Sequence, residues 1–216
     1  MPDFAIESRL GNNATVFGFD EAGRGPWCGP VVAACACWQN QDIPVSLKQQ
    51  IDDSKKLSGL KRERLFEEIK QSSCIYGIGY ASAEEIDSLN ILQATFLAMK
   101  RAMENACQTF HIKPTHALID GNRLPKDWPV PCQCVIKGDH LSLSVATASI
   151  LAKVTRDRIM CELAQIYPHY GWDRNAGYGT KEHIQALAQH GITPYHRRSY
   201  APIKALIEQM VAKNTD

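Results

Sequence analysis

Four acidic side chains stand where strand-like runs of the sequence end. They are Asp20 and Glu21 after the run 15–19, Asp120 after the run 116–119, and Asp139 after the run 130–137. In an α/β sheet, functional groups collect at strand ends, where loops meet a rigid scaffold. Carboxylates gathered there repel one another and raise one another's pKa values unless a divalent cation lies between them. Since hard cations such as Mg²⁺ prefer carboxylate oxygens, the pattern is consistent with a metal site, although each acid alone is typical of a turn.

The segment Asp20-Glu21-Ala22-Gly23-Arg24-Gly25-Pro26 adds a phosphate-binding feature to these acids. Gly23 and Gly25 flank Arg24, which allows a tight turn and a close approach of the backbone to a ligand. Arg24 offers a forked donor that fits a phosphate. Metal-binding acids beside such an arginine predict phosphodiester chemistry. The alternative interpretation is a Gly-rich hairpin with Arg24 in a salt bridge, which agreement of residue type and spacing over so many positions disfavours.

The elements around these residues predict an α/β fold with a mixed β-sheet flanked by helices. The expected strands are 15–19, 31–38, 75–81, 116–119 and 130–137, and the expected helices are 58–72, 91–110, 142–163, 181–190 and 202–212. The apolar stripe of the first helix consists of Leu60, Leu65, Phe66 and Ile69. We expect one catalytic domain over 1–216, with an α/β core at about 16–160 and a C-terminal helical extension at about 161–216.

The composition is that of an ordinary globular protein. Of the 216 residues, 44% are hydrophobic and 22% are charged, and the formal net charge is +1. Disorder is therefore not indicated, and nucleic-acid binding would need locally clustered base. The local basic clusters are Lys55, Lys56, Lys61, Arg62 and Arg64, and His196, Arg197 and Arg198. Each cluster taken alone predicts a solvated surface face rather than a phosphate track.

No targeting or membrane segment is expected. The N-terminus Met1-Pro2-Asp3-Phe4 is acidic and lacks the apolar run of a signal peptide. The sequence has no stretch of about 20 apolar residues, so no transmembrane helix is expected. These observations predict a cytoplasmic protein.

The eight cysteines do not predict a zinc site or a disulfide scaffold. Cys35 and Cys37, and likewise Cys132 and Cys134, have C-x-C spacing in strand-like runs, so each pair shares one face as small buried hydrophobes would. No C-x-x-C occurs, and no histidine stands at zinc-ligand spacing to these pairs.

Asp157 and two histidines lie near the motifs but have simpler explanations. Asp157 lies inside the expected helix 142–163 with Lys153 four residues before it, which favours a salt bridge over a metal role. His140 and His183 could shuttle protons. No spacing rule requires this, so we expect both to be surface or packing residues.

The motifs as a set resemble the ribonuclease HII family. The matching stretches are Asp20–Pro26, Asp53–Leu57, Ile119–Asn122, Lys137–Asp139, Ala148–Asp157, Gly177–Thr180 and His196–Tyr200. They occur in family order and cover the chain from about 16 to 203, with no departure at a functional position. Ala146-Thr147-Ala148 is a mild change where many relatives carry an alanine run.

This resemblance implies a ribonuclease H-like fold with a C-terminal helical region, and it implies roles for particular residues. Those similar to the family's metal-binding carboxylates are Asp20, Glu21, Asp120 and Asp139. Gly23, Arg24 and Gly25 match the loop that senses the ribose 2′-hydroxyl. Tyr178 matches a tyrosine that stacks on the deoxyribose after the ribonucleotide. Ser54 and Lys55 are similar to residues near the substrate phosphates.

The implied activity is that of an endonuclease using two Mg²⁺ or Mn²⁺ ions. It would cut the RNA strand of RNA–DNA hybrids and cut 5′ of single ribonucleotides in duplex DNA, leaving 5′-phosphate and 3′-hydroxyl ends. The implied roles are removal of misincorporated ribonucleotides and of RNA primers. We expect a monomer. No clamp-binding peptide is recognised near Asp216, so contact with a replication clamp is left open.

Three alternatives compete with this hypothesis. Ribonuclease HIII resembles this family but carries an extra N-terminal domain, for which the residues before the first strand leave no room. A non-catalytic hybrid-binding module would keep Arg24 but would not need four acids. A metal-binding structural protein would lose stability with a chelator yet show no nuclease activity.

Overall fold

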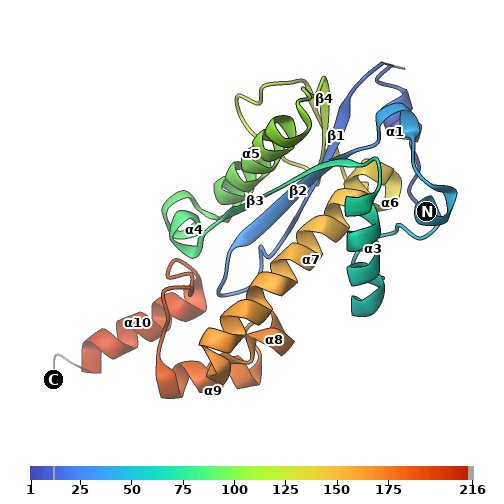
Figure 1. Cartoon of the computed structure of the whole chain (residues 1–216). Coiled ribbons are helices and arrows are strands. Elements are labelled where there is room, and N and C mark those ends of the chain that lie inside the picture. Colours follow the sequence, from blue (N-terminus) through green and yellow to red (C-terminus); the bar gives the residue numbers. More distant parts are fainter. Residues whose placement is uncertain (12, 214–216) are drawn as a thin grey trace.

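The computed structural model describes residues 1–11 and 13–213, and within them the strands form one five-stranded sheet in the order β3-β2-β1-β4-β5 (Figure 1). The strands are β1 (Val16–Ala22), β2 (Val31–Cys37), β3 (Ile75–Ala81), β4 (His116–Asp120) and β5 (Cys132–Val135). β1, β2 and β3 pair antiparallel, whereas β4 runs parallel to both β1 and β5. The predicted mixed sheet is confirmed, although Asp20 and Glu21 lie inside β1 rather than after it.

The long helices α5 (Ile91–Phe110) and α7 (Leu143–Ile166) lie on opposite faces of the sheet (Figure 1). Side chains of β2 alternate between them: Cys35 packs in the cluster with α5, and Ala36 packs in the cluster with α7. Glycines in the strands permit this close packing. A Cβ at Gly77 would lie 2.0 Å from the carbonyl oxygen of Ala102 in α5.

Shorter helices connect and extend this core. They are α1 (Ala5–Ser8), α2 (Val45–Lys48), α3 (Gly59–Gln71), α4 (Ala83–Leu89), α6 (Gly138–Leu141), α8 (Trp172–Asn175), α9 (Lys181–His190) and α10 (Ala201–Lys213), with 3₁₀ turns at Gln39–Gln41 and Pro168–Tyr170. The predicted C-terminal helices are confirmed as α9 and α10. A separate apolar cluster joins the C-terminal half of α7 to this region, with Met160, Tyr170 and Trp172 among its buried members.

Some local predictions were wrong. Leu60 is 88% exposed, because only Leu65, Phe66 and Ile69 of α3 reach the core. The cysteines of β5 are only half-buried, since β5 is an edge strand, whereas those of β2 are buried. No helix of the described residues is long and apolar enough to cross a membrane. The question of a clamp-binding peptide at Asp216 lies outside the described residues.

Candidate active site

The four predicted carboxylates gather near the carboxyl ends of the parallel strands. Asp20 and Glu21 are the fifth and sixth residues of β1, and Asp120 is the last residue of β4, its parallel neighbour. Asp139 lies in the first turn of α6, after Lys137 turns the chain through a left-handed conformation. Asp20 and Asp139 are buried, whereas Glu21 and Asp120 are half-buried.

The four acids lie close enough for their charges to repel one another, and we call Asp20, Glu21, Asp120 and Asp139 the carboxylate cluster. The pKa of Asp20 is raised well above its ordinary value, first by burial and then by the charges of Glu21 and Asp120. Burial also raises the pKa of Glu21, although Arg24 opposes the shift. The pKa of Asp139 is raised by burial and then by Asp120. A cluster of oxygen ligands with this much unrelieved negative charge fits a divalent cation.

Backbone hydrogen bonds orient two of these side chains. Oδ1 of Asp120 accepts a hydrogen bond from the amide of Gly138 at 2.7 Å, which joins the end of β4 to the start of α6. Oδ1 of Asp20 accepts from the amide of Glu21 at 2.7 Å. The turn that carries Asp139 is therefore positioned by a neighbouring acid of the same cluster.

Asp53 and His140 adjoin the cluster, and sequence reasoning assigned neither of them to the site. Ligand atoms of Asp53, Asp139 and His140 lie within 4.8 Å of one another, a spacing that suits one ion. Among the described residues, the other predicted acids form no group of three that meets this spacing. His140 is half-buried, and its Nδ1 lies 3.2 Å from Nζ of Lys56. The sequence did give one sign that Asp53 could belong to the site, because Asp53 is the first residue of the family-matching stretch Asp53–Leu57.

The predicted substrate-binding residues line one cleft beside the carboxylates. Its lining comprises Asp20, Glu21, Ala22, Gly23, Arg24, Gly25, Ser54, Lys55, Lys153 and Tyr178. Burial alone would lower the pKa of Lys55, but the charges of nearby carboxylates, Asp20 and Asp139 first among them, outweigh it and raise that pKa. Lys153, which sequence reasoning treated only as the partner of Asp157, adds a further cation to this cleft.

Arg24 forms the salt bridge that the alternative interpretation of the motif described. Its Nη1 lies 3.1 Å from Oε1 of Glu21, and its side chain is 49% exposed. The Glu21 side chain is only 13% exposed, but the half-exposed guanidinium of Arg24 has further N–H donors that can bind a phosphate while the salt bridge is kept. The salt bridge and a phosphate-binding role are therefore compatible.

Gly25 and Tyr178 come from distant parts of the chain and meet at the rim of the cleft. A Cβ at Gly25 would lie 3.3 Å from Cε1 of Tyr178, so the ring rests directly on the loop backbone. Tyr178 is 51% exposed. A half-exposed aromatic ring beside a glycine loop offers a flat surface to a sugar or base.

The prediction that residues 196–198 form a solvated face was wrong for His196 and Arg197, which are buried. Arg197 donates hydrogen bonds to the carbonyls of Gly23, Arg24 and Gly29, and so supports the loop from below. Burial lowers its pKa. Most partners of Arg197 are backbone carbonyls, and its one side-chain acceptor is the hydroxyl of Tyr200 rather than an acid, so charge pairing in the sequence gave no sign of its burial.

Comparisons with known proteins agree with this geometry. The sequence matches the family described as Ribonuclease HII over residues 17–203. It is similar to the ribonuclease HII of Magnetococcus marinus, with 56% identity over 95% of each chain. It is 52% identical to that of Paramagnetospirillum magneticum, over 94% of this chain and 97% of the relative. The crystal structure of ribonuclease H2 from Pyrococcus horikoshii OT3 aligns with a TM-score of 0.72 at 28% identity, covering 91% of this chain and 99% of that one.

Proposed function

This chain belongs to the ribonuclease HII family and is a ribonuclease H endonuclease, and we propose that it cuts 5′ of single ribonucleotides embedded in duplex DNA as well as within longer RNA–DNA hybrids. The observation that carries this proposal is the shared cleft, in which two of the predicted acids adjoin the Gly23–Gly25 loop and Tyr178. An acid cluster explains hydrolysis, whereas the loop and the ring supply a means to distinguish one ribonucleotide among deoxyribonucleotides.

We propose that the carboxylate cluster binds two Mg²⁺ or Mn²⁺ ions through Asp20, Glu21, Asp120 and Asp139. Bound there, such ions would activate a water for in-line attack and stabilise the departing 3′ oxygen, giving 5′-phosphate and 3′-hydroxyl ends. The raised pKa values of Asp20 and Asp139 support this proposal, because neighbouring cations relieve the repulsion that contributes to them. The ligands are oxygens, which favour hard ions.

The remaining residues of the cleft bind and orient the substrate in this proposal. Arg24, Lys55 and Lys153 bring positive charge to phosphates of the nucleic-acid backbone. The backbone of Gly23–Gly25 faces the 2′-hydroxyl, and the exposed ring of Tyr178 stacks on the next deoxyribose. Ser54, which is buried beside Lys55 and lines the cleft, lies near the substrate phosphates in this proposal. The proposed cellular roles are ribonucleotide removal and RNA primer removal, carried out by a monomer.

The direct test uses a labelled DNA duplex with one embedded ribonucleotide and Mg²⁺. The native chain should cut immediately 5′ of the ribonucleotide. Asp120→Asn should lower the rate by more than about 100-fold, because loss of even an outer partner of a metal site typically costs about 10–100-fold. Asp127→Asn is the matched control: it makes the same charge change at an exposed loop position and should cut normally.

Two outcomes would contradict the proposal. If the native chain binds the duplex but never cuts it with Mg²⁺ or Mn²⁺, the hybrid-binding module takes its place for this substrate. If cleavage occurs but Asp120→Asn cuts as fast as Asp127→Asn, the proposed metal-binding role of Asp120 is wrong.

A further inference from the structure

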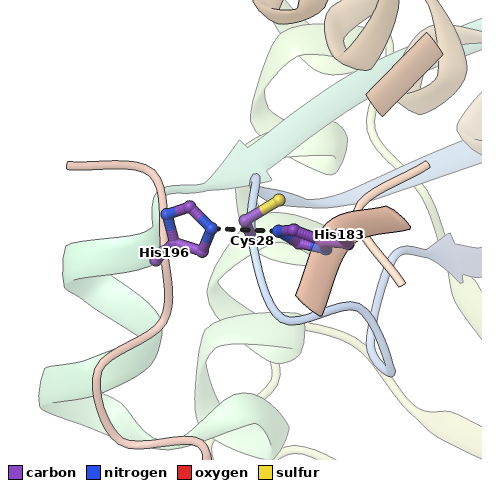
Figure 2. A group of neighbouring side chains, drawn as sticks. All are labelled: Cys28, His183 and His196. Carbon is purple, nitrogen blue, oxygen red and sulfur yellow. Dashed lines mark hydrogen bonds between the residues drawn. The ribbon is translucent and has the colours of Figure 1, made fainter. Parts of the chain in front are cut away.

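A buried cluster of polar side chains lies beneath the loop that carries Tyr178. Figure 2 shows Cys28, His183 and His196 converging from three segments: the loop between β1 and β2, the first turn of α9, and the loop after α9. All three are at most 1% exposed. None of them lines the cleft, and the proposed mechanism uses none of them.

The surrounding donors assign a proton to one nitrogen of each histidine ring. The amide of Thr193 donates to Nδ1 of His196 at 2.9 Å, so the ring proton of a neutral His196 is on Nε2. That Nε2 lies 3.0 Å from Nε2 of His183, which also accepts from the indole N–H of Trp172 at 3.3 Å. His183 therefore carries its proton on Nδ1, which donates to the carbonyl of Tyr178 at 3.0 Å.

These hydrogen bonds form a one-directional series, which we call the histidine chain: from the Thr193 amide through His196 and His183 to the carbonyl of Tyr178. Burial lowers the pKa of His183, and it lowers that of His196 to about 4, so both rings are neutral at pH 7. Burial likewise raises the pKa of Cys28 to about 12, which keeps the thiol uncharged. The charged groups that act on these residues are Glu182, Arg156 and Arg197.

The same three residues are also ligand types for zinc, and their ligand atoms lie within 4.8 Å of one another. A zinc ion would have to take Nε2 of both histidines, which moves the proton of His196 to Nδ1. That proton could reach the hydroxyl of Thr193, which lies 3.0 Å from Nδ1, but the amide N–H of Thr193 would lose its acceptor. The indole N–H of Trp172 would also lose its acceptor. The donors around the pair therefore favour the histidine chain over a metal.

We infer that His183 and His196 are positioning residues, which hold the backbone of Tyr178 so that its ring sits over Gly25 and favours a ribonucleotide junction. This inference rests on the proposed role of Tyr178. The carbonyl of Tyr178 accepts from His183 and also from the amide of Thr180 at 2.8 Å. Removing the histidine leaves one of these two anchors, so the ring loses alignment while the carboxylate cluster is untouched.

The test compares His183→Leu with His183→Asn on two substrates: a duplex with one ribonucleotide and a long RNA–DNA hybrid. The amide nitrogen of Asn stands as many bonds from Cα as Nδ1 does, so Asn can restore the hydrogen bond to Tyr178. His183→Leu should raise KM for the single-ribonucleotide duplex by about 3- to 10-fold, the effect of one lost hydrogen bond, and should change kcat little. Cleavage of the long hybrid should stay within about twofold, and His183→Asn should recover most of the loss.

A double-mutant cycle separates positioning from general loss of stability. In a Tyr178→Ala background, His183→Leu should have no further effect on the single-ribonucleotide duplex, because the ring it positions is gone. His190→Leu, at an exposed position at the end of α9, is the matched control and should behave as native. If His183→Leu does not fold, His196→Leu breaks the chain one link earlier and carries the same expectation.

Three results would overturn this inference: equal losses on both substrates, additivity with Tyr178→Ala, or stoichiometric zinc in the purified protein by metal analysis. The proposed function fails differently. In that case the native chain itself does not cut the single-ribonucleotide duplex, whatever residue stands at position 183.

Discussion

The carboxylate cluster and the region around the histidine chain both reach the same cleft, but their polar groups are satisfied to different degrees. In the cluster, burial and repulsion raise the pKa values of Asp20, Glu21 and Asp139. In the other region, every ring nitrogen of His183 and His196 has a partner, and the stacked rings of Trp172 and Tyr170 are buried. The first region is incomplete without a ligand, whereas the second holds its geometry alone.

The carboxylate cluster therefore supplies the chemistry of the cleft, whereas the region of the histidine chain supports its shape. An acid cluster that was fully paired within the chain would have no need of a cation. A loop support that depended on the cation would lose its alignment whenever the metal left. We therefore expect substitutions around the histidine chain to lower the stability of the metal-free protein, and neutralisation of an acid in the carboxylate cluster to raise it.

The largest effect on the stability of the metal-free protein should come from Trp172→Ala. Trp172 is fully buried, stacks on Tyr170 at 5.0 Å between ring centroids, and donates to His183. Removing a buried aromatic side chain typically costs about 3–5 kcal/mol. Chemical denaturation in the presence of a chelator should show this loss in the free energy of unfolding.

Ile184→Ala is a suitable comparison for Trp172→Ala, because Ile184 is on α9 but 49% exposed. It should change stability by less than about 0.5 kcal/mol. A Trp172→Ala variant as stable as Ile184→Ala would show that the histidine chain and its aromatic surroundings do not stabilise this end of the molecule.

Asp20→Asn should have a smaller effect and should stabilise the metal-free protein. The folded pKa of Asp20 is raised, first by burial, above the value of about 3.9 for an unfolded chain. Between these two values the folded state binds more protons, so stability of the metal-free protein falls as pH rises through that window. Asp20→Asn removes this penalty and should raise the Tm at pH 7 by about 2–4 °C, which corresponds to about 1 kcal/mol in a chain of this size.

With Mg²⁺ bound, native protein should become more stable than Asp20→Asn. Native protein should gain stability as Mg²⁺ is added, since a ligand of the folded state stabilises it by mass action, and Asp20→Asn should gain less. Thermal unfolding at pH 5, 7 and 8, with and without Mg²⁺, measures both effects. If Asp20→Asn is less stable than native in chelator at every pH, repulsion does not dominate the cluster.

The same contrast explains how far the sequence could predict the structure. Strands and long helices follow from apolar periodicity, and Ser58, Asn90 and Ser142 cap their helices as side-chain acceptors. The gathering of Asp20 and Asp120 was also predictable, because acids near strand ends are visible in a sequence, but the parallel pairing of β1 with β4 was not predicted. Short helices such as α4 were not, since a helix of seven residues shows too little periodicity.

The features that could not be predicted are those set by backbone conformation or by contacts with backbone groups. The left-handed conformation of Lys137 ends the strand early and starts α6, and no residue preference announces it. Arg197 donates mainly to backbone carbonyls, and Nδ1 of His196 accepts from a backbone amide, so much of their burial depends on groups that do not distinguish one residue type from another. A sequence shows which side chains could pair with one another, but it does not show which backbone groups they will meet.

The smallest effect should come from Asp157→Asn, which tests the boundary of the carboxylate cluster. Asp157 is an acid within a matching motif, yet its Oδ1 lies 2.7 Å from Nζ of Lys153, one helical turn away, and both side chains are about one-third exposed. Such a pair contributes about 0.3–0.5 kcal/mol, so Tm should fall by no more than about 2 °C. The stabilisation by Mg²⁺ should match that of native protein, in contrast to Asp20→Asn. Loss of that stabilisation in Asp157→Asn would place Asp157 among the metal ligands and extend the cluster along α7.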